Sequence, residues 1–160
     1  MSERTLILFR HAKSDQSSSE ADIDRPLNPR GQRQAPEAGR WLSENIDEID
    51  LAVVSPAHRA RTTWELASAE LGRQPETRIE DRLYAASVPD LLGVLHEWPD
   101  DAHTVVLVGH NPGIEDLASV LTNESVSMPT SAIAVLKSDA AWSSAGESWA
   151  SHWVAGRPPA

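Results

Sequence analysis

Three short apolar runs, separated by segments with a helical pattern, constrain the fold of this chain more than any other feature. The runs are LILF at 6–9, LAVV at 51–54 and TVVLV at 104–108. Apolar runs of this length, bounded by polar residues, are typical of strands that are buried on both faces. The segments between and after them have the composition and spacing of amphipathic helices, at 32–46, 57–71, 88–98 and 113–121. This alternation predicts a three-layer α/β/α sandwich around a mostly parallel sheet.

The remaining elements complete this predicted sheet. A short strand is expected at 77–79, and two consecutive strands at 131–137 and 147–154 predict an antiparallel edge. Pro36 fits only the first turn of a helix, so the helix within 32–46 is expected to begin near Gln34. A length of 160 residues suits one domain spanning 1–160, with 155–160 as a loose tail.

Composition excludes several classes of function. The chain has no cysteine, which excludes disulfides, thiolate metal sites and cysteine nucleophiles. Its formal net charge of −10 disfavours general binding to nucleic acid or to an anionic membrane. The apolar runs are too short to span a bilayer, and the N-terminus has no signal-peptide pattern, so a cytoplasmic location is expected.

The three apolar runs end in a similar way. The first is followed by Arg10 and His11, the second by SPAHR at 55–59, and the third by His110 and Asn111. If the strands are parallel, these ends lie at one edge of the sheet, where α/β proteins bind ligands. The guanidinium group of an arginine can donate two parallel hydrogen bonds to phosphate oxygens. A neutral imidazole can attack phosphorus. The pattern predicts a phosphate site that needs no metal or cofactor, since no metal-binding motif is present.

These motifs also carry a family resemblance. RHA at 10–12, SPAHRARTT at 55–63 and GHNP at 109–112 resemble the histidine phosphatase superfamily, whose fold is similar to that of phosphoglycerate mutase. The chain is most similar to the SixA-type phosphohistidine phosphatases, through RHAKS at 10–14, DRPLNPRG at 24–31, SPAHRARTT, LYAAS at 83–87 and VGHNPG at 108–113. The resemblance covers most of the chain, from the first strand to the helix after His110.

The resemblance implies roles for individual residues. His11 would accept the phosphoryl group, and Arg10, Arg59 and His110 would form the pocket that holds it. Asn28 lies where the wider family often has a residue with a hydroxyl group. One interpretation is that the Asn28 side chain contacts the phosphate. Arg25, Arg30, Arg33 and Arg61 either rim the pocket or are ordinary surface arginines.

The main departure from the family pattern is that no residue can be clearly assigned as the general acid. Larger members carry a glutamate after the third strand, whereas this chain offers Asp81, or Glu80 behind it, and either can equally be a loop charge. An alkoxide leaving group depends strongly on protonation by a general acid. Imidazole is a better leaving group, because its reference pKa is only about 6.5, and it depends much less on such an acid. We therefore expect a preference for phosphoramidates or activated esters over simple sugar phosphates.

The sequence favours a phosphatase that acts through a phosphohistidine at His11 on a phosphohistidine protein. One alternative is a phosphatase of small phosphomonoesters, and another is a phosphate-recognising binding module without turnover. The loops at 15–25 and 84–90 are expected to set specificity. The sequence does not indicate an oligomeric state.

Overall fold

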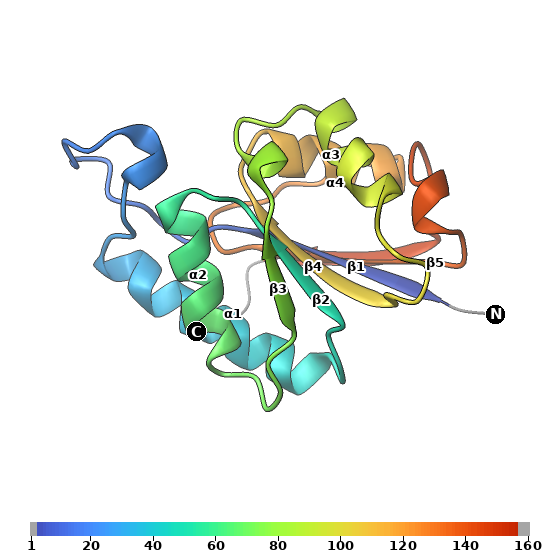
Figure 1. The fold of residues 1–160 in the computed structure, drawn as a ribbon, viewed down its shortest axis with the longest axis horizontal. Helices are drawn as coiled ribbons and strands as arrows, with labels where there is room; N and C mark the ends of the chain where they lie inside the picture. Colours follow the sequence, from blue (N-terminus) through green and yellow to red (C-terminus); the bar gives the residue numbers. More distant parts are fainter. Residues whose placement is uncertain (1–2, 157–160) are drawn as a thin grey trace.

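The computed structural model describes residues 3–156, in which six strands form one mixed sheet of order β3-β2-β4-β1-β5-β6 (Figure 1). The strands are β1 (Arg4–Arg10), β2 (Leu51–Val54), β3 (Glu76–Ile79), β4 (Thr104–Gly109), β5 (Ile133–Ser138) and β6 (His152–Gly156). The α-helices are α1 (Pro29–Asn45), α2 (His58–Ser68), α3 (Val88–His96) and α4 (Gly113–Thr122). Three 3-10 helices complete the fold, η1 (Asp22–Asp24), η2 (Asp81–Leu83) and η3 (Trp142–Ser144).

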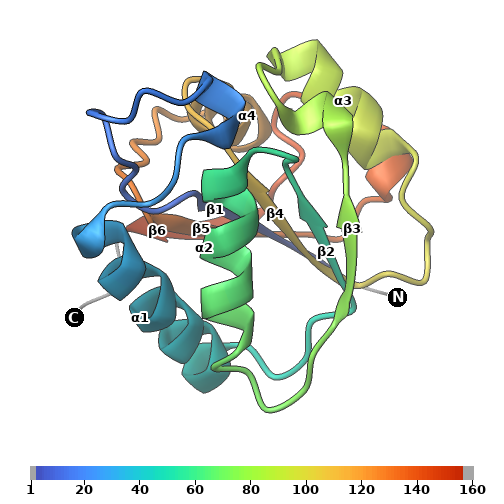
Figure 2. The same ribbon diagram turned by 60° about the vertical axis from the view of Figure 1, so that its left-hand side comes forward.

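Alternation along β1 explains why the sheet is covered on both faces. Leu6 and Leu8 belong to a core shared with α3 and α4, whereas Ile7 and Phe9 belong to a core shared with α1 and α2. Successive side chains of a strand point to opposite faces, so an apolar run of four residues must be covered twice. Figures 1 and 2 show α1 and α2 on one side of the sheet and α3 and α4 on the other, which confirms the predicted three layers.

The strand pairing confirms a mostly parallel sheet with an antiparallel edge. β4 lies between β1 and β2 and is parallel to both, while β5 is antiparallel to β1 and β6 to β5. In this register Arg10 lies opposite Gly109, and Val54 lies opposite Val108. The carboxyl ends of β1, β2 and β4 are therefore level, and the residues that follow them emerge at one edge.

The start of α1 differs from the prediction, because the helix begins at Pro29 and not near Gln34. The Asn28 side chain accepts a hydrogen bond of 2.8 Å from the N–H of Gly31, which caps the helix, and Pro29 occupies the first position. Asparagine and proline in these two places form a strong start signal. Pro36 consequently lies inside the helix, where it removes one backbone hydrogen bond.

The C-terminal part of the chain also differs in its boundaries. The last strand begins at His152, and Trp149, which was expected within it, lies before it and stacks on Trp142 at a centroid distance of 5.3 Å. Ala155 and Gly156 pair with β5, so the predicted tail does not begin at 155. The rest of that predicted tail lies outside the described residues. Within residues 3–156 no helix is both long enough and apolar enough to cross a membrane.

Close packing of α1 on α2 gives a test of the fold. A Cβ on Gly39 would lie 2.1 Å from the carbonyl oxygen of Ala67, so Gly39→Ala must push the two helices apart. We expect this overpacking to lower the free energy of unfolding by about 2 kcal/mol, measured by urea denaturation.

Gly93→Ala is the matched control, because Gly93 also lies inside a helix but a Cβ there meets nothing within 4 Å. Alanine has the higher helix propensity, so this substitution should raise the free energy of unfolding by up to about 1 kcal/mol. If the free energy of unfolding changed in the same direction in both variants, this result would contradict the close packing of α1 on α2.

Candidate active site

A polar pocket of about 180 Å³ lies at the edge where β1, β2 and β4 end. Its lining combines the two motif histidines with three arginines and a lysine. The lining residues are Arg10, His11, Lys13, Ser14, Gln16, Arg25, Arg59, His110, Asn111 and Thr130. A larger hollow of about 340 Å³ lies between the C-terminal ends of α1 and α2, and its lining includes neither motif histidine.

His11 directly follows β1 and is held in one tautomer by the backbone. Its Nδ1 lies 2.8 Å from the carbonyl oxygen of Ala12, which can only accept, so Nδ1 carries the proton. The lone pair of the ring is therefore on Nε2. The residue is 7% exposed, and this burial lowers its pKa to about 3, so the imidazole is neutral near pH 7. A neutral ring with a free Nε2 is suited to nucleophilic attack.

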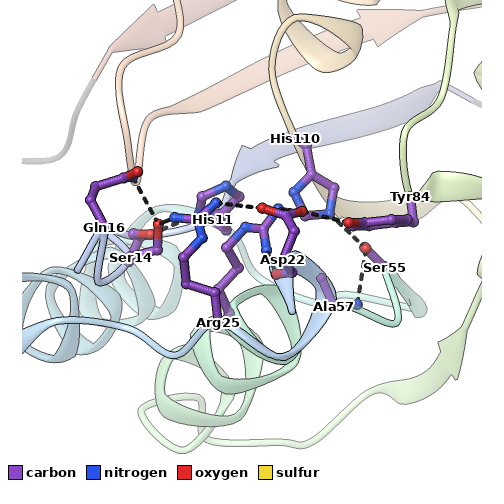
Figure 3. A network of polar contacts seen from close by, with 11 residues as sticks. His11, Ser14, Gln16, Asp22, Arg25, Ser55, Ala57, Tyr84 and His110 are labelled. Carbon is purple, nitrogen blue, oxygen red and sulfur yellow. Dashed lines mark hydrogen bonds and ion pairs between the residues drawn. The ribbon is translucent and has the colours of Figure 1, made fainter. Parts of the chain in front are cut away.

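His110 follows β4 and packs beside His11, with ring centroids 5.0 Å apart. Its Nε2 lies 2.7 Å from the hydroxyl oxygen of Ser55, a buried residue directly after β2. That oxygen also accepts the N–H of Ala57, so its own O–H is available to Nε2, which favours the proton on Nδ1 (Figure 3). Burial, followed by the nearby Arg59, lowers the His110 pKa to about 4. Nδ1 is buried and has no hydrogen-bond partner within residues 3–156.

The arginines reach the pocket from three segments. Arg10 ends β1 and donates to the carbonyl oxygen of Met128 at 3.0 Å. Arg59 lies in the first turn of α2, is 5% exposed, and donates to the carbonyl oxygen of Asp22 at 2.6 Å. Arg25 comes from the loop before α1 and donates to the hydroxyl of Ser14. Their guanidinium groups give the pocket a local positive charge within an acidic protein.

Asp22, at the start of η1, connects several of these groups (Figure 3). Its carboxylate lies 3.0 Å from Arg25 and 3.1 Å from Arg59, and it accepts the hydroxyl of Tyr84 at 2.5 Å. The hydrogen bond from Tyr84, followed by that from Arg25, holds the Asp22 pKa well below its usual range. Asp22 is therefore an anion near neutral pH.

The structure brings together the four residues on which the sequence pattern converges, Arg10, His11, Arg59 and His110. Asn28 does not line the pocket, and its side chain instead caps α1. Of the four arginines considered as a possible rim, only Arg25 is among the lining residues.

Neither candidate for the general acid lines the pocket. The Glu80 carboxylate lies 2.8 Å from Arg82, whose hydrogen bonds hold the pKa of Glu80 below its usual value. Asp81 is exposed at the start of η2. Within residues 3–156, no carboxylic acid is therefore placed at the pocket as a ready proton donor.

Sequence reasoning missed Asp22, Ser55 and Tyr84 as parts of the site. Ser55 and Tyr84 lie in the motifs SPAHRARTT and LYAAS, and Asp22 lies in the loop at 15–25, but no spacing points to these particular side chains. Tyr84 also packs edge-on against His110, with centroids 5.6 Å apart. Within the described part of the chain, no group of three or more His, Asp or Glu side chains could hold a metal ion.

Comparison with known proteins places these features in context. Residues 6–120 match the model of the histidine phosphatase superfamily, branch 1. An uncharacterized protein of Mycobacterium tuberculosis is 38% identical over 145 residues, which cover 84% of this chain and 89% of that protein. A structure from Nakamurella multipartitia that carries the name of phosphohistidine phosphatase SixA has 32% identity and a TM-score of 0.80, covering 100% of this chain and 99% of that one. SixA complexed with tungstate has a TM-score of 0.82 at 22% identity, covering 96% and 97%, which shows the same fold.

The lowered histidine pKa values predict an unusual titration. An ordinary imidazole gains its proton near pH 6.5, but His11 and His110 should stay neutral until the pH approaches about 3 and about 4. In a nitrogen-detected NMR titration, their ring signals should not move between about pH 8 and about pH 6.

The same shifts predict a loss of stability in acid. The unfolded chain takes up these protons near pH 6.5, before the folded protein does, so the free energy of unfolding should fall as the pH drops from about 6.5 toward about 4. A ring signal of either histidine that titrates near pH 6.5 would contradict the buried, neutral pair.

Proposed function

The chain belongs to the histidine phosphatase superfamily, which supports phosphatase activity, and we propose that it acts through a covalent phosphohistidine at His11. The observation that carries this proposal is the hydrogen bond from His11 Nδ1 to the carbonyl oxygen of Ala12. That bond leaves the lone pair on Nε2 in a residue that lines an arginine-rich pocket.

The reaction has two displacements at phosphorus. In the first, Nε2 of His11 forms a bond to phosphorus while the bond to the leaving group breaks, and the leaving group takes up a proton. In the second, a water oxygen attacks phosphorus, the bond to Nε2 breaks, and the water loses a proton as inorganic phosphate forms. Splitting one displacement into two is the advantage of a covalent intermediate.

The surrounding residues stabilise the transferred group. Arg10 and Arg59 can each offer two N–H donors to the equatorial oxygens, and His110 Nδ1 supplies a further donor. Phosphoryl transfer depends mainly on such positioning and charge stabilisation. Because both histidines are neutral, the positive charge of the pocket comes from arginine and lysine and does not depend on histidine protonation.

We propose a phosphohistidine in a protein as the substrate. A pocket of about 180 Å³ is smaller than the roughly 300–1,000 Å³ of typical small-molecule sites, so it suits the phosphoryl group with the rest of the substrate outside. An imidazole leaving group needs no strong general acid, in keeping with the Glu80 and Asp81 positions away from the pocket. The name that the Nakamurella structure carries also supports this substrate class. A cytoplasmic location stays a prediction.

The covalent step can be tested by replacing the nucleophile. We expect phosphate release from a phosphohistidine protein to persist in EDTA and to fall by at least about a thousandfold in His11→Ala. A rapid quench with labelled substrate should trap an acid-labile, base-stable phosphoenzyme in the parent and none in this variant.

His58→Ala is the matched control, because His58 is an exposed histidine on α2 that does not line the pocket. Its rate should remain within about twofold of the parent, as expected for a surface position. Turnover that survives in His11→Ala would remove His11 as the nucleophile, and the absence of both turnover and phosphoenzyme in the parent would favour a binding module.

The leaving group provides a separate test of substrate class. The ratio of kcat/KM for a phosphohistidine protein to that for a sugar phosphate should exceed about a hundredfold, because only the alkoxide depends strongly on a positioned acid. The kcat/KM for p-nitrophenyl phosphate, which has a good leaving group, should lie between these two values. Comparable values for the phosphohistidine protein and the sugar phosphate would contradict this substrate class and favour a small-molecule phosphatase.

A further inference from the structure

The Asp22 carboxylate occupies the arginines that the substrate is expected to use. It lies 3.1 Å from Nη2 of Arg59 and 3.0 Å from Nη2 of Arg25, and both arginines line the pocket. The carbonyl oxygen of Asp22 accepts from Nη1 of Arg59 as well, at 2.6 Å. Asp22 therefore engages both terminal nitrogens of Arg59.

Arg59 is fixed in place by more than this contact. It is 5% exposed and belongs to the first turn of α2, so the protein surrounds its side chain. Its Nε is buried and has no hydrogen-bond partner in the described part of the chain. A phosphoryl group that binds this guanidinium through two nitrogens must share at least one terminal nitrogen with Asp22, which brings the two anions close together.

Asp22, in contrast, lies at the surface of the site. Its side chain is 57% exposed, and none of the three residues of η1 is buried. A carboxylate that leaves the arginine can therefore be hydrated at once. Tyr84, which donates to the same carboxylate, can hold it at the rim of the pocket.

We propose that Asp22 is an internal competitor of the phosphoryl group: its carboxylate neutralises Arg25 and Arg59 before substrate binds, and it gives up its contact with Arg59 when the phosphoryl dianion arrives. The inference rests on the proposed function and adds a residue that sets the affinity of that site for phosphate. Asp22 weakens the binding of substrate and of inorganic phosphate alike, and its return to Arg59 assists the release of the product. In this role Asp22 tunes affinity and takes no part in the chemical steps.

A purely structural role for Asp22 would have the opposite effect on phosphate binding. If its main role were to align Arg59, removing its charge would weaken phosphate binding. The burial of Arg59 favours the competitor role, because the guanidinium stays in the pocket when the carboxylate is gone. The sign of the change in phosphate affinity distinguishes the two roles.

The test is the dissociation constant of inorganic phosphate, measured by calorimetry on the whole protein without any substrate. In Asp22→Asn the constant should fall by about tenfold, as expected when one negative charge is removed close to a bound dianion. Steady-state kinetics should show a parallel decrease in KM and in the inhibition constant of phosphate, with no increase in kcat.

Asp24→Asn is the matched control. Asp24 lies in the same short helix and carries the same charge, but its side chain makes no hydrogen bond or ion pair within residues 3–156. The phosphate affinity of Asp24→Asn should stay within about twofold of the parent, because the Asp24 carboxylate contacts neither Arg25 nor Arg59 and is screened by solvent.

The outcomes separate this inference from the proposed function. Phosphate binding that is unchanged or weaker in Asp22→Asn overturns the competitor role, as does equal tightening in both variants, while parental phosphate binding still supports the phosphatase site. A parent protein that does not bind inorganic phosphate at millimolar concentration contradicts the phosphate pocket itself, and the inference with it.

Discussion

Parallel pairing of β4 with both β1 and β2 is the constraint on which the site depends. Nearly a hundred residues separate His11 from His110, and only this register places Arg10 opposite Gly109 and Val54 opposite Val108. Ser55 and His110 then meet across the edge of the sheet at 2.7 Å. Because these strands are buried on both faces, a slip of one residue would exchange side chains between the two cores and move the strand ends out of line, so the packing that stabilises the sheet also aligns the site.

The loop after β1 is held against the start of α1, which explains the place of Asn28 in the molecule. The backbone N–H of Asn28 donates to the carbonyl oxygen of Lys13 at 3.0 Å, while its side chain caps the helix. The backbones approach closely here, because a Cβ on Gly31 would lie 2.0 Å from that same oxygen. Asn28 therefore supports the segment next to His11 without lining the pocket.

The candidate site combines two neutral histidines with the positive charge of its arginines. Burial keeps His11 and His110 uncharged, so in the proposed function phosphate recognition falls to the arginines. An excess of fixed positive charge would hold the product as firmly as the substrate. In the proposed competitor role, the Asp22 carboxylate at the edge of the pocket offsets that tendency, and its exposure allows it to exchange places with a phosphate.

The sequence by itself determined the layers of the fold and the central residues of the site. Apolar runs of strand length, separated by helical spacing, can be buried only in a sheet covered on both faces, and parallel strands must end at a common edge. The start of α1 and the extent of β6 were misjudged, because the Asn28–Pro29 cap outweighed Pro36, and strand pairing with β5 continued through Gly156. Only the tertiary structure decided that Tyr84 donates a hydrogen bond to Asp22, 62 positions away, and that Arg59 donates to the same carboxylate oxygen. Loops follow no periodic pattern, and the positions of their side chains depend on how the finished layers pack.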